Sequence, residues 1–252
     1  MSSNEKYQNE HEKKCIDIIK SKFSVKNCFG LTPENYSIIE KHLEEIEPNE
    51  KSNEFPDFLF PNGFVEHFMI TSSKESKNKG AAHKIALSKF EKKNEKSAQE
   101  LSYQKPTYRN SLEYSGHSHS NLVNSFKSNW NNHIGNLEKY HGNKDNGIFL
   151  VEYFENPALS MAELKLEGTD GLFIGDYNSD QEVIYSYRLS RDKKLLNWLY
   201  QFKDRIEYVI FLTEDNVEII KLSNILKLLK ILPYDYIIAP NMTLMTDGGI
   251  LF

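Results

Sequence analysis

Apolar residues recur along this chain with two alternating periods, one typical of helices and one typical of strands. The clearest helical segment is 120–140, where Val123, Phe126, Trp130 and Ile134 follow three- and four-residue spacing. Similar spacing, with capping residues and breakers, predicts further helices over 5–22, 33–46, 81–96, 192–202 and 223–232. Short apolar runs predict strands over 148–154, 183–189, 206–212, 217–222 and 236–239. Periodicity is weak in 97–119 and 155–180, apart from a strand-like piece at 172–174.

This alternation predicts one α/β domain over residues 1–252, with a mixed central sheet flanked by helices. A length of 252 residues is compatible with one large domain. Helices within 1–50 are expected to pack on a core formed by 51–155. The remaining part, 156–252, is expected to extend the same sheet.

Two aromatic-rich runs flank a Pro-Asn-Gly sequence at 61–63, and this pattern predicts a β-hairpin. A two-residue Asn-Gly turn would place Asp57 and Glu66 diagonally on one face, with Cβ atoms about 7 Å apart. A three-residue loop over all of 61–63 would place Asp57 opposite His67 and turn Glu66 to the other face. The sequence leaves both registers open, so Glu66 and His67 are alternative partners of Asp57.

Asp57 and Glu66 are the candidate ligands of a magnesium ion. Mg²⁺ prefers oxygen ligands, commonly one or two carboxylates with water and a substrate phosphate completing the shell. A cation held there would neutralise charge on a phosphate and lower the pKa of an attacking water. The pair is therefore compatible with hydrolysis of a phosphodiester.

A Pro-Asp pair ending at Asp57, followed after eight residues by Glu66, resembles the start of the motif of the PD-(D/E)xK (restriction-endonuclease-like) nuclease superfamily. The resemblance implies a mixed sheet flanked by helices and a Mg²⁺-dependent endonuclease acting on DNA. It also implies that Asp57 and Glu66 are catalytic residues and metal ligands. The superfamily has a lysine two residues after the acid, whereas this chain has Phe68 there. His67 and Lys74 are the candidates that remain to position water or stabilise charge.

The chain also resembles uncharacterised bacterial and phage proteins that carry similar PDF…GFxEHF…TSSK blocks, which begin here at Pro56, Gly63 and Thr71. Together the two resemblances imply a role in restriction or phage defence. The alternative is a catalytically inactive nuclease-like fold that serves as a protein- or nucleic-acid-binding module in phage defence or counter-defence.

Charge is distributed unevenly along the chain. The formal net charge of −5 excludes a uniformly basic nucleic-acid-binding protein. Residues 74–144 nevertheless carry 13 basic and 6 acidic side chains, while both flanking parts are net acidic. Because this basic part follows the hairpin directly, we expect local contact with DNA phosphates. The candidate contacts are Lys77, Lys79, Lys127, Asn131, Arg188 and Arg191, with pairing to nearby acidic side chains as the alternative for the two arginines.

Histidine and cysteine offer a second type of metal ligand. Four histidines close in sequence fit either a transition-metal site or hydrogen bonding at the surface, namely His117, His119, His133 and His141. The two cysteines, Cys15 and Cys28, lack CxxC spacing. The absence of that spacing argues against structural zinc. Cys15 lies on the apolar stripe of the predicted helix over 5–22, which predicts a packing role.

Location and partners follow from the apolar content of the chain. No run of about eighteen apolar residues occurs and the N-terminal segment is polar, so we expect a cytoplasmic protein without a membrane role. The apolar end, 248–252, is a candidate docking segment for a protein partner or for a second copy of this chain.

Overall fold

The computed structural model describes residues 3–49, 54–73, 81–113, 116–154, 158–164, 183–184, 186–232, 235–240 and 244–250. The helices follow the predicted segments closely, and several of them start with a side-chain cap, whereas Asn224 before α6 provides none. Thr32 accepts a hydrogen bond from the Asn35 backbone before α2, and Ser118 accepts one from the Asn121 backbone before α4. The helices are α1 (Ser3–Lys22), α2 (Pro33–Glu44), α3 (Ala81–Gln99), α4 (His119–Lys139), α5 (Lys193–Leu199) and α6 (Ile225–Ile231), with 3-10 turns η1 (Val25–Asn27), η2 (Leu189–Arg191), η3 (Tyr200–Phe202) and η4 (Leu222–Asn224).

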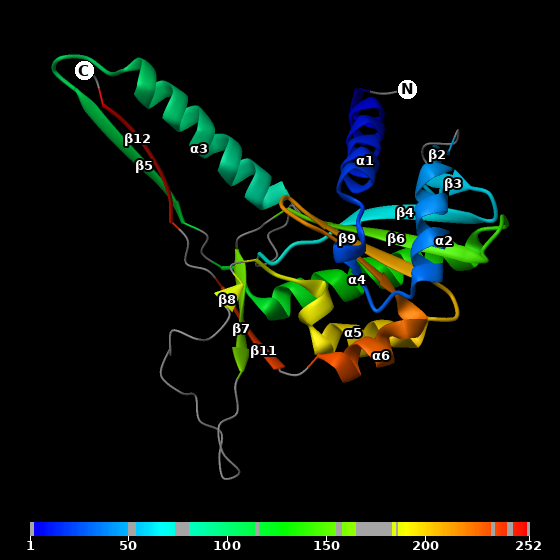
Figure 1. Ribbon diagram of the computed structural model, residues 1–252. Helices are drawn as coiled ribbons and strands as arrows, with labels where there is room; N and C mark the ends of the chain where they lie inside the picture. The colour runs from blue at the N-terminus through cyan, green and yellow to red at the C-terminus, as the bar shows by residue number, and fades with distance from the viewer. Residues whose placement is uncertain are drawn as a thin grey trace, which may run out of the picture.

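A seven-stranded mixed sheet forms the centre of the molecule (Figure 1). Its strands, in spatial order, are β1 (Cys28–Phe29), β10 (Val217–Lys221), β9 (Tyr208–Thr213), β6 (Asn146–Tyr153), β4 (Gly63–Met69), β3 (Phe58–Phe60) and β2 (Glu47–Pro48). Strand β6 runs parallel to both β4 and β9, whereas the β2–β3, β3–β4 and β9–β10 pairs are antiparallel. The predicted fold class, an α/β fold with a mixed central sheet flanked by helices, is confirmed.

The two faces of this sheet support two separate hydrophobic cores. Alternation along β4 sends Phe64 to the core under α4, α5 and α6, and sends Val65 to the core under α1 and α2. The first core contains the fully buried Trp130, and the second contains Ile19 and Ile39. Each strand of the sheet centre is therefore buried on both sides, as its continuous apolar sequence predicts.

Two smaller sheets lie outside the central one. Strand β7 (Leu159–Leu164) pairs with β8 (Val183–Ile184) and β11 (Asp235–Pro240), and β5 (Thr107–Glu113) pairs with β12 (Leu244–Ile250). The β5–β12 ribbon and α3 form an arm that extends away from the central sheet (Figure 1). Residues 156–252 therefore extend the central sheet only through β9 and β10. No described helix is long and apolar enough to cross a membrane.

Several strands were not expected from the sequence, including the two-residue strands β1 and β2. Strands β5 and β7 fall within the segments of weak periodicity, and β12 covers residues that we interpreted as a docking segment. The described end of the chain instead pairs with β5 in antiparallel register, from Leu244 with Glu113 to Ile250 with Thr107. The predicted strand-like piece at 172–174 and the last two residues lie outside the described residues.

Candidate functional site

Strands β3 and β4 form the predicted hairpin, but in a register that differs from both expected alternatives. Phe60 pairs with Gly63, so the two-residue turn lies at 61–62. The same register, continued just before β3, places Asp57 directly opposite Glu66. Both expected registers are therefore wrong. The observed register nevertheless places Asp57 and Glu66, the two predicted metal ligands, next to each other.

The turn and the close approach of the strands explain this register. Asn62 has a φ of 67°, the left-handed conformation that a type II turn needs after its proline and that asparagine tolerates. Gly63 lies in the strand, where a Cβ would overlap the Phe60 ring and the backbone oxygen of Asn146. The glycine is thus required for close packing, whereas the predicted registers had assigned it to the turn.

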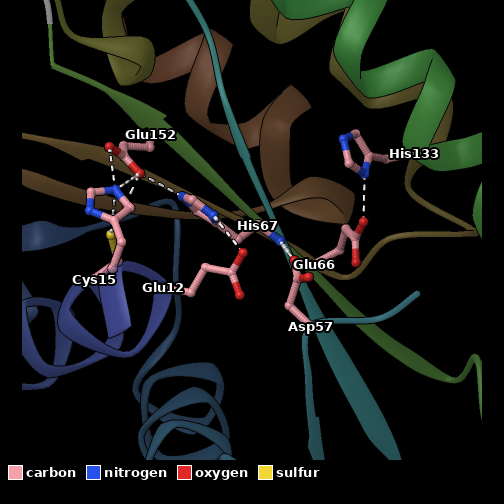
Figure 2. A network of polar contacts seen from close by, with 8 residues as sticks. Glu12, Cys15, Asp57, Glu66, His67, His133 and Glu152 are labelled. Atoms are coloured by element: carbon pink, nitrogen blue, oxygen red, sulfur yellow. Dashed lines mark hydrogen bonds and ion pairs between the residues drawn. The ribbon is translucent and has the colours of Figure 1, made fainter. Parts of the chain in front are cut away.

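The half-buried Asp57 and the buried Glu66 form an acidic pair next to α4 (Figure 2). Glu66 is 5% exposed, and its Oε1 lies 2.6 Å from Nδ1 of His133. Its Oε2 is buried and, within the described part of the chain, has no hydrogen-bond partner. Asp57 Oδ2 accepts a 2.7 Å hydrogen bond from the backbone N–H of His67. We call Asp57, Glu66 and His133 the acidic site.

The electrostatics of the acidic site favour protonated carboxyl groups. Burial, followed by the negative charges of Glu66 and Glu12, raises the pKa of Asp57 to about 7. Burial raises the pKa of Glu66 to about 8, and the nearby Asp57 offsets only part of that effect. Burial also lowers the pKa of His133, so the short contact between Glu66 and His133 suits a neutral carboxyl that donates to a neutral imidazole. A divalent cation would relieve the same cost by neutralising the carboxylates.

A surface cavity of about 660 Å³ lies along the elements that carry the acidic site. Its lining includes Leu59, two residues beyond Asp57, and Asn136, three residues beyond His133 on α4. Lys139 and His141 also line it and are the groups there that can carry positive charge.

The side chain of His67 lies on the opposite face of β4 from Glu66, because successive strand residues alternate. Its Nε2 lies 2.6 Å from Oε2 of Glu152 on β6, and its Nδ1 lies 4.0 Å from Oε1 of Glu12 on α1 (Figure 2). His67 thus reaches Asp57 only through its backbone. The expectation that its imidazole stands beside Asp57 does not hold.

His67 and Glu152 belong to a second cluster, which two residues of α1 complete. Nε2 of His11 lies 3.0 and 2.9 Å from the two carboxylate oxygens of Glu152. The Cys15 thiol donates to Glu152 Oε2 at 3.6 Å, and its sulfur lies 3.9 Å from His11 Nε2. One potential ligand atom from each of the four side chains lies within 4.8 Å of the other three. We call His11, Cys15, His67 and Glu152 the mixed cluster.

Glu152 remains ionised in spite of complete burial. Burial alone would raise its pKa, but hydrogen bonds from His11 and His67 lower the pKa to about 2. From sequence alone, Glu152 in the predicted strand 148–154 is either an additional acid or the exposed position of an edge strand, and its burial in the sheet interior excludes the second. Its position in an otherwise apolar strand, together with the four-residue spacing of His11 and Cys15 on one helix face, was the available signal.

Phe68 occupies the position at which the nuclease motif has its lysine. It is 5% exposed and belongs to the core under α4. The His133 ring stacks on it, with ring centroids 4.6 Å apart and planes 15° apart. The other candidate for a positive charge, Lys74, lies outside the described residues.

The histidines near α4 do not gather at one place. His117 lies 2.8 Å from the Ser72 hydroxyl, His119 lies 2.6 Å from Asp192 Oδ2, and His133 pairs with Glu66. The predicted alternative of hydrogen bonding therefore describes these three side chains, while His141 lines the cavity described above.

The candidate DNA contacts lie on different elements. The Lys127 ammonium lies 5.1 Å from the centre of the Trp198 ring. Arg191 donates to the Tyr236 hydroxyl at 2.8 Å. Burial raises the pKa of Glu218, and the positive charge of Arg188 offsets part of that rise. Asn131 is exposed on α4. Lys77 and Lys79 lie outside the described residues.

Comparison with protein-family models, with curated proteins and with solved structures finds no match to this chain.

Proposed function

We propose that this chain is a Mg²⁺-dependent phosphodiester hydrolase acting on DNA, with Asp57 and Glu66 as the metal ligands. One observation carries the proposal: the half-buried Asp57, just before β3, lies opposite the buried Glu66 on β4, and one Glu66 oxygen has no hydrogen-bond partner among the described residues. A buried polar atom without a partner is costly, and a cation would satisfy it.

The chemistry of the acidic site supports an oxygen-preferring cation. A bound Mg²⁺ would supply charge neutralisation at a phosphate and a more acidic water. Asp57 and Glu66 would hold it, and the hydrogen bond from His133 would orient Glu66. The acidic-site residues do not line the surface cavity, but its lining continues along β3 and α4 from them and offers Lys139 and His141, together with the acidic Glu54, to a nucleic-acid backbone.

Phe68 favours a second candidate function. The buried phenyl ring cannot stabilise negative charge as the lysine of the nuclease motif would. The second candidate is therefore a catalytically inactive nuclease-like fold that binds nucleic acid or protein, in the setting of phage defence or counter-defence that the sequence resemblance implies. The first candidate requires turnover, whereas the second requires binding alone.

The deciding experiment measures cleavage of supercoiled plasmid by the purified full chain with EDTA, Mg²⁺ or Mn²⁺. We expect nicking that depends on the divalent cation and falls more than about 100-fold in Asp57→Asn and in Glu66→Gln, because losing a metal ligand should cost more than losing an outer-shell partner. The matched control is Asp145→Asn, which changes an exposed carboxylate just before β6.

The outcomes separate the two candidates. Cleavage that persists unchanged in Asp57→Asn would contradict the hydrolase. A wild-type chain that cleaves nothing, but binds DNA without Mg²⁺ and in a salt-sensitive way, would favour the second candidate, the inactive binding module, over the hydrolase. Mg²⁺ binding itself, followed by calorimetry, should be absent from both acidic-site variants and present in Asp145→Asn.

A further inference from the structure

We propose that the mixed cluster, His11, Cys15, His67 and Glu152, is a binding site for a Zn²⁺-class divalent cation that fastens α1 to the central sheet. The site is distinct from the acidic site, and it would exist whether or not the chain hydrolyses DNA. Its ligands come from three elements that are far apart in sequence: α1, β4 and β6.

The geometry is close to a tetrahedral metal shell. Zinc bonds of about 2.0–2.3 Å place neighbouring ligand atoms about 3.3–3.8 Å apart. In the cluster the Cys15 sulfur lies 3.6 Å from Glu152 and 3.9 Å from His11, and the histidine contacts to Glu152 are 2.6–3.0 Å. The remaining pairs of ligand atoms lie within 4.8 Å of one another. Movements of about 1 Å or less would therefore turn these hydrogen bonds into a ligand shell around one cation.

The ligand types select the metal. Imidazole and thiolate suit Zn²⁺ and similar transition metals, whereas Mg²⁺ prefers oxygen alone. Binding would release the Cys15 thiol proton to solvent, so the thiolate and the Glu152 carboxylate together would balance the two positive charges of the cation. The resulting neutral centre suits a place where both of these side chains are buried.

The surroundings match those of a structural site. Four protein ligands complete a tetrahedral shell and leave no position for substrate. Nδ1 of His67 faces Glu12 at 4.0 Å, so a small approach would let Glu12 accept a hydrogen bond from Nδ1 while Nε2 binds the metal. His11 and Cys15 lie one helical turn apart, so one cation would hold a face of α1 against β4 and β6 (Figure 2).

The chain supplies a matched cysteine control. Cys28 lies in β1, outside the cluster, and burial raises its pKa to about 12, which disfavours a thiolate there. Cys15→Ser should therefore lose the metal, and Cys28→Ser should keep it.

The experiment uses the full chain, free of any purification tag, titrated with Zn²⁺ against a chromogenic chelator and separately with Co²⁺. We expect one Zn²⁺ per chain, and with Co²⁺ a thiolate-to-metal charge-transfer band together with the intense visible bands of tetrahedral cobalt. Cys15→Ser should abolish the charge-transfer band and weaken Zn²⁺ binding more than about 100-fold, while Glu12→Gln should weaken it by about 10–100-fold. Cys28→Ser should match the wild type.

Hydrogen exchange on the wild-type chain keeps the test independent of how well the variants fold. Zn²⁺ should slow amide exchange in α1. Absence of stoichiometric binding, a Co²⁺ spectrum without thiolate character, or an exchange pattern in α1 that Zn²⁺ leaves unchanged would each overturn the proposal. Asp57→Asn should retain the Zn²⁺ site, so failure of the hydrolase and failure of this site give different results.

Discussion

Two glutamates buried on opposite faces of the central sheet behave in opposite ways. Glu66 on β4 has a pKa raised to about 8, while Glu152 on the neighbouring β6 has a pKa lowered to about 2. Both are at most 5% exposed, so burial alone does not distinguish them. The difference lies in their partners: Glu152 accepts hydrogen bonds from two histidines, whereas Glu66 contacts one histidine and faces the acidic Asp57.

This contrast shows how one strand can serve two chemistries. Glu66 and His67 are consecutive, and the alternation of β4 directs one to a set of oxygen ligands and the other to a set with nitrogen and sulfur. A hard cation fits the first set and a softer cation fits the second.

Zinc should stabilise the chain far more than magnesium does. At a free Zn²⁺ concentration about 1,000 times the dissociation constant, binding adds about 4 kcal/mol to the free energy of unfolding. For a chain of this size that raises Tm by about 8–16 °C. Thermal unfolding with Zn²⁺ or Mg²⁺ measures the effect, and Cys15→Ser should remove the Zn²⁺ shift alone. Equal shifts by the two ions would contradict the assignment of separate sites.

Replacing each glutamate by glutamine should change stability in opposite directions in the metal-free protein near pH 8. Glu152→Gln removes the charge that two histidines contact, and we expect a loss of about 2–3 kcal/mol. Glu66→Gln removes a buried acid that resists ionisation, and we expect a gain of about 1 kcal/mol. Urea unfolding measures both variants. A loss of similar size in both would show that the two environments do not differ as described.

The pH dependence of stability should also have two limbs. The folded pKa values of Asp57 and Glu66, about 7 and 8, exceed the unfolded values of about 4. At pH values between the unfolded and the folded pKa, the native state therefore binds more protons than the unfolded state. Their contribution is fully present below about pH 4 and is lost as the pH rises through 7 and 8, by about 1–3 kcal/mol in total. The groups that face this pair are Glu12, His67 and His133.

Glu152 has the opposite sign, because its folded pKa of about 2 lies below the unfolded value of about 4.3. Its contribution is present above about pH 4 and is lost as the pH falls toward 2. Unfolding followed from pH 2 to 9 in a chelator should therefore show a maximum near pH 4–5. Glu66→Gln should flatten the alkaline limb, and Glu152→Gln should flatten the acidic limb. A maximum that neither variant shifts would contradict the cited pKa directions.

Glu12 on α1 acts electrostatically on the acidic site across the central sheet. Removing its charge should change pKa values by less than the substitutions above change stability. Its negative charge raises the pKa of both Asp57 and Glu66. Glu12→Gln should therefore lower both pKa values, with little change at residues remote from the sheet. Carbon-13 NMR titration of the carboxyl groups measures these values. If both pKa values stay unchanged in Glu12→Gln, the charge of Glu12 is too well screened to act on Asp57 and Glu66.

The sequence predicted the local elements better than the contacts between them. Helix α4 could be predicted because its apolar stripe, including Phe126 and Trp130, repeats at helical spacing within one segment. Strand β5 could not, because its mixed residues make a strand only when β12 pairs with it. Long-range pairing leaves no local signal in either segment.

The same limit applies to the two clusters. Asp57 and Glu66 were predictable because a hairpin joins neighbours in the sequence, although the tight packing at Gly63 changed their register. The mixed cluster was not predictable, since His11 and Glu152 meet only after β6 has entered the sheet beside β4. We predicted a packing role for Cys15, and its burial agrees with packing; the histidines beside it are visible only in three dimensions.

The pairing of β5 with β12 has a consequence for biosynthesis. Thr107 leaves the ribosome well before Ile250, its partner, so β5 must wait for most of the remaining chain to be translated. During that interval its backbone N–H and C=O groups form an open edge that another nascent chain can join. The arm should therefore complete its fold last, after the central sheet. Slowed translation beyond β5 would prolong this exposure and increase the demand for chaperones.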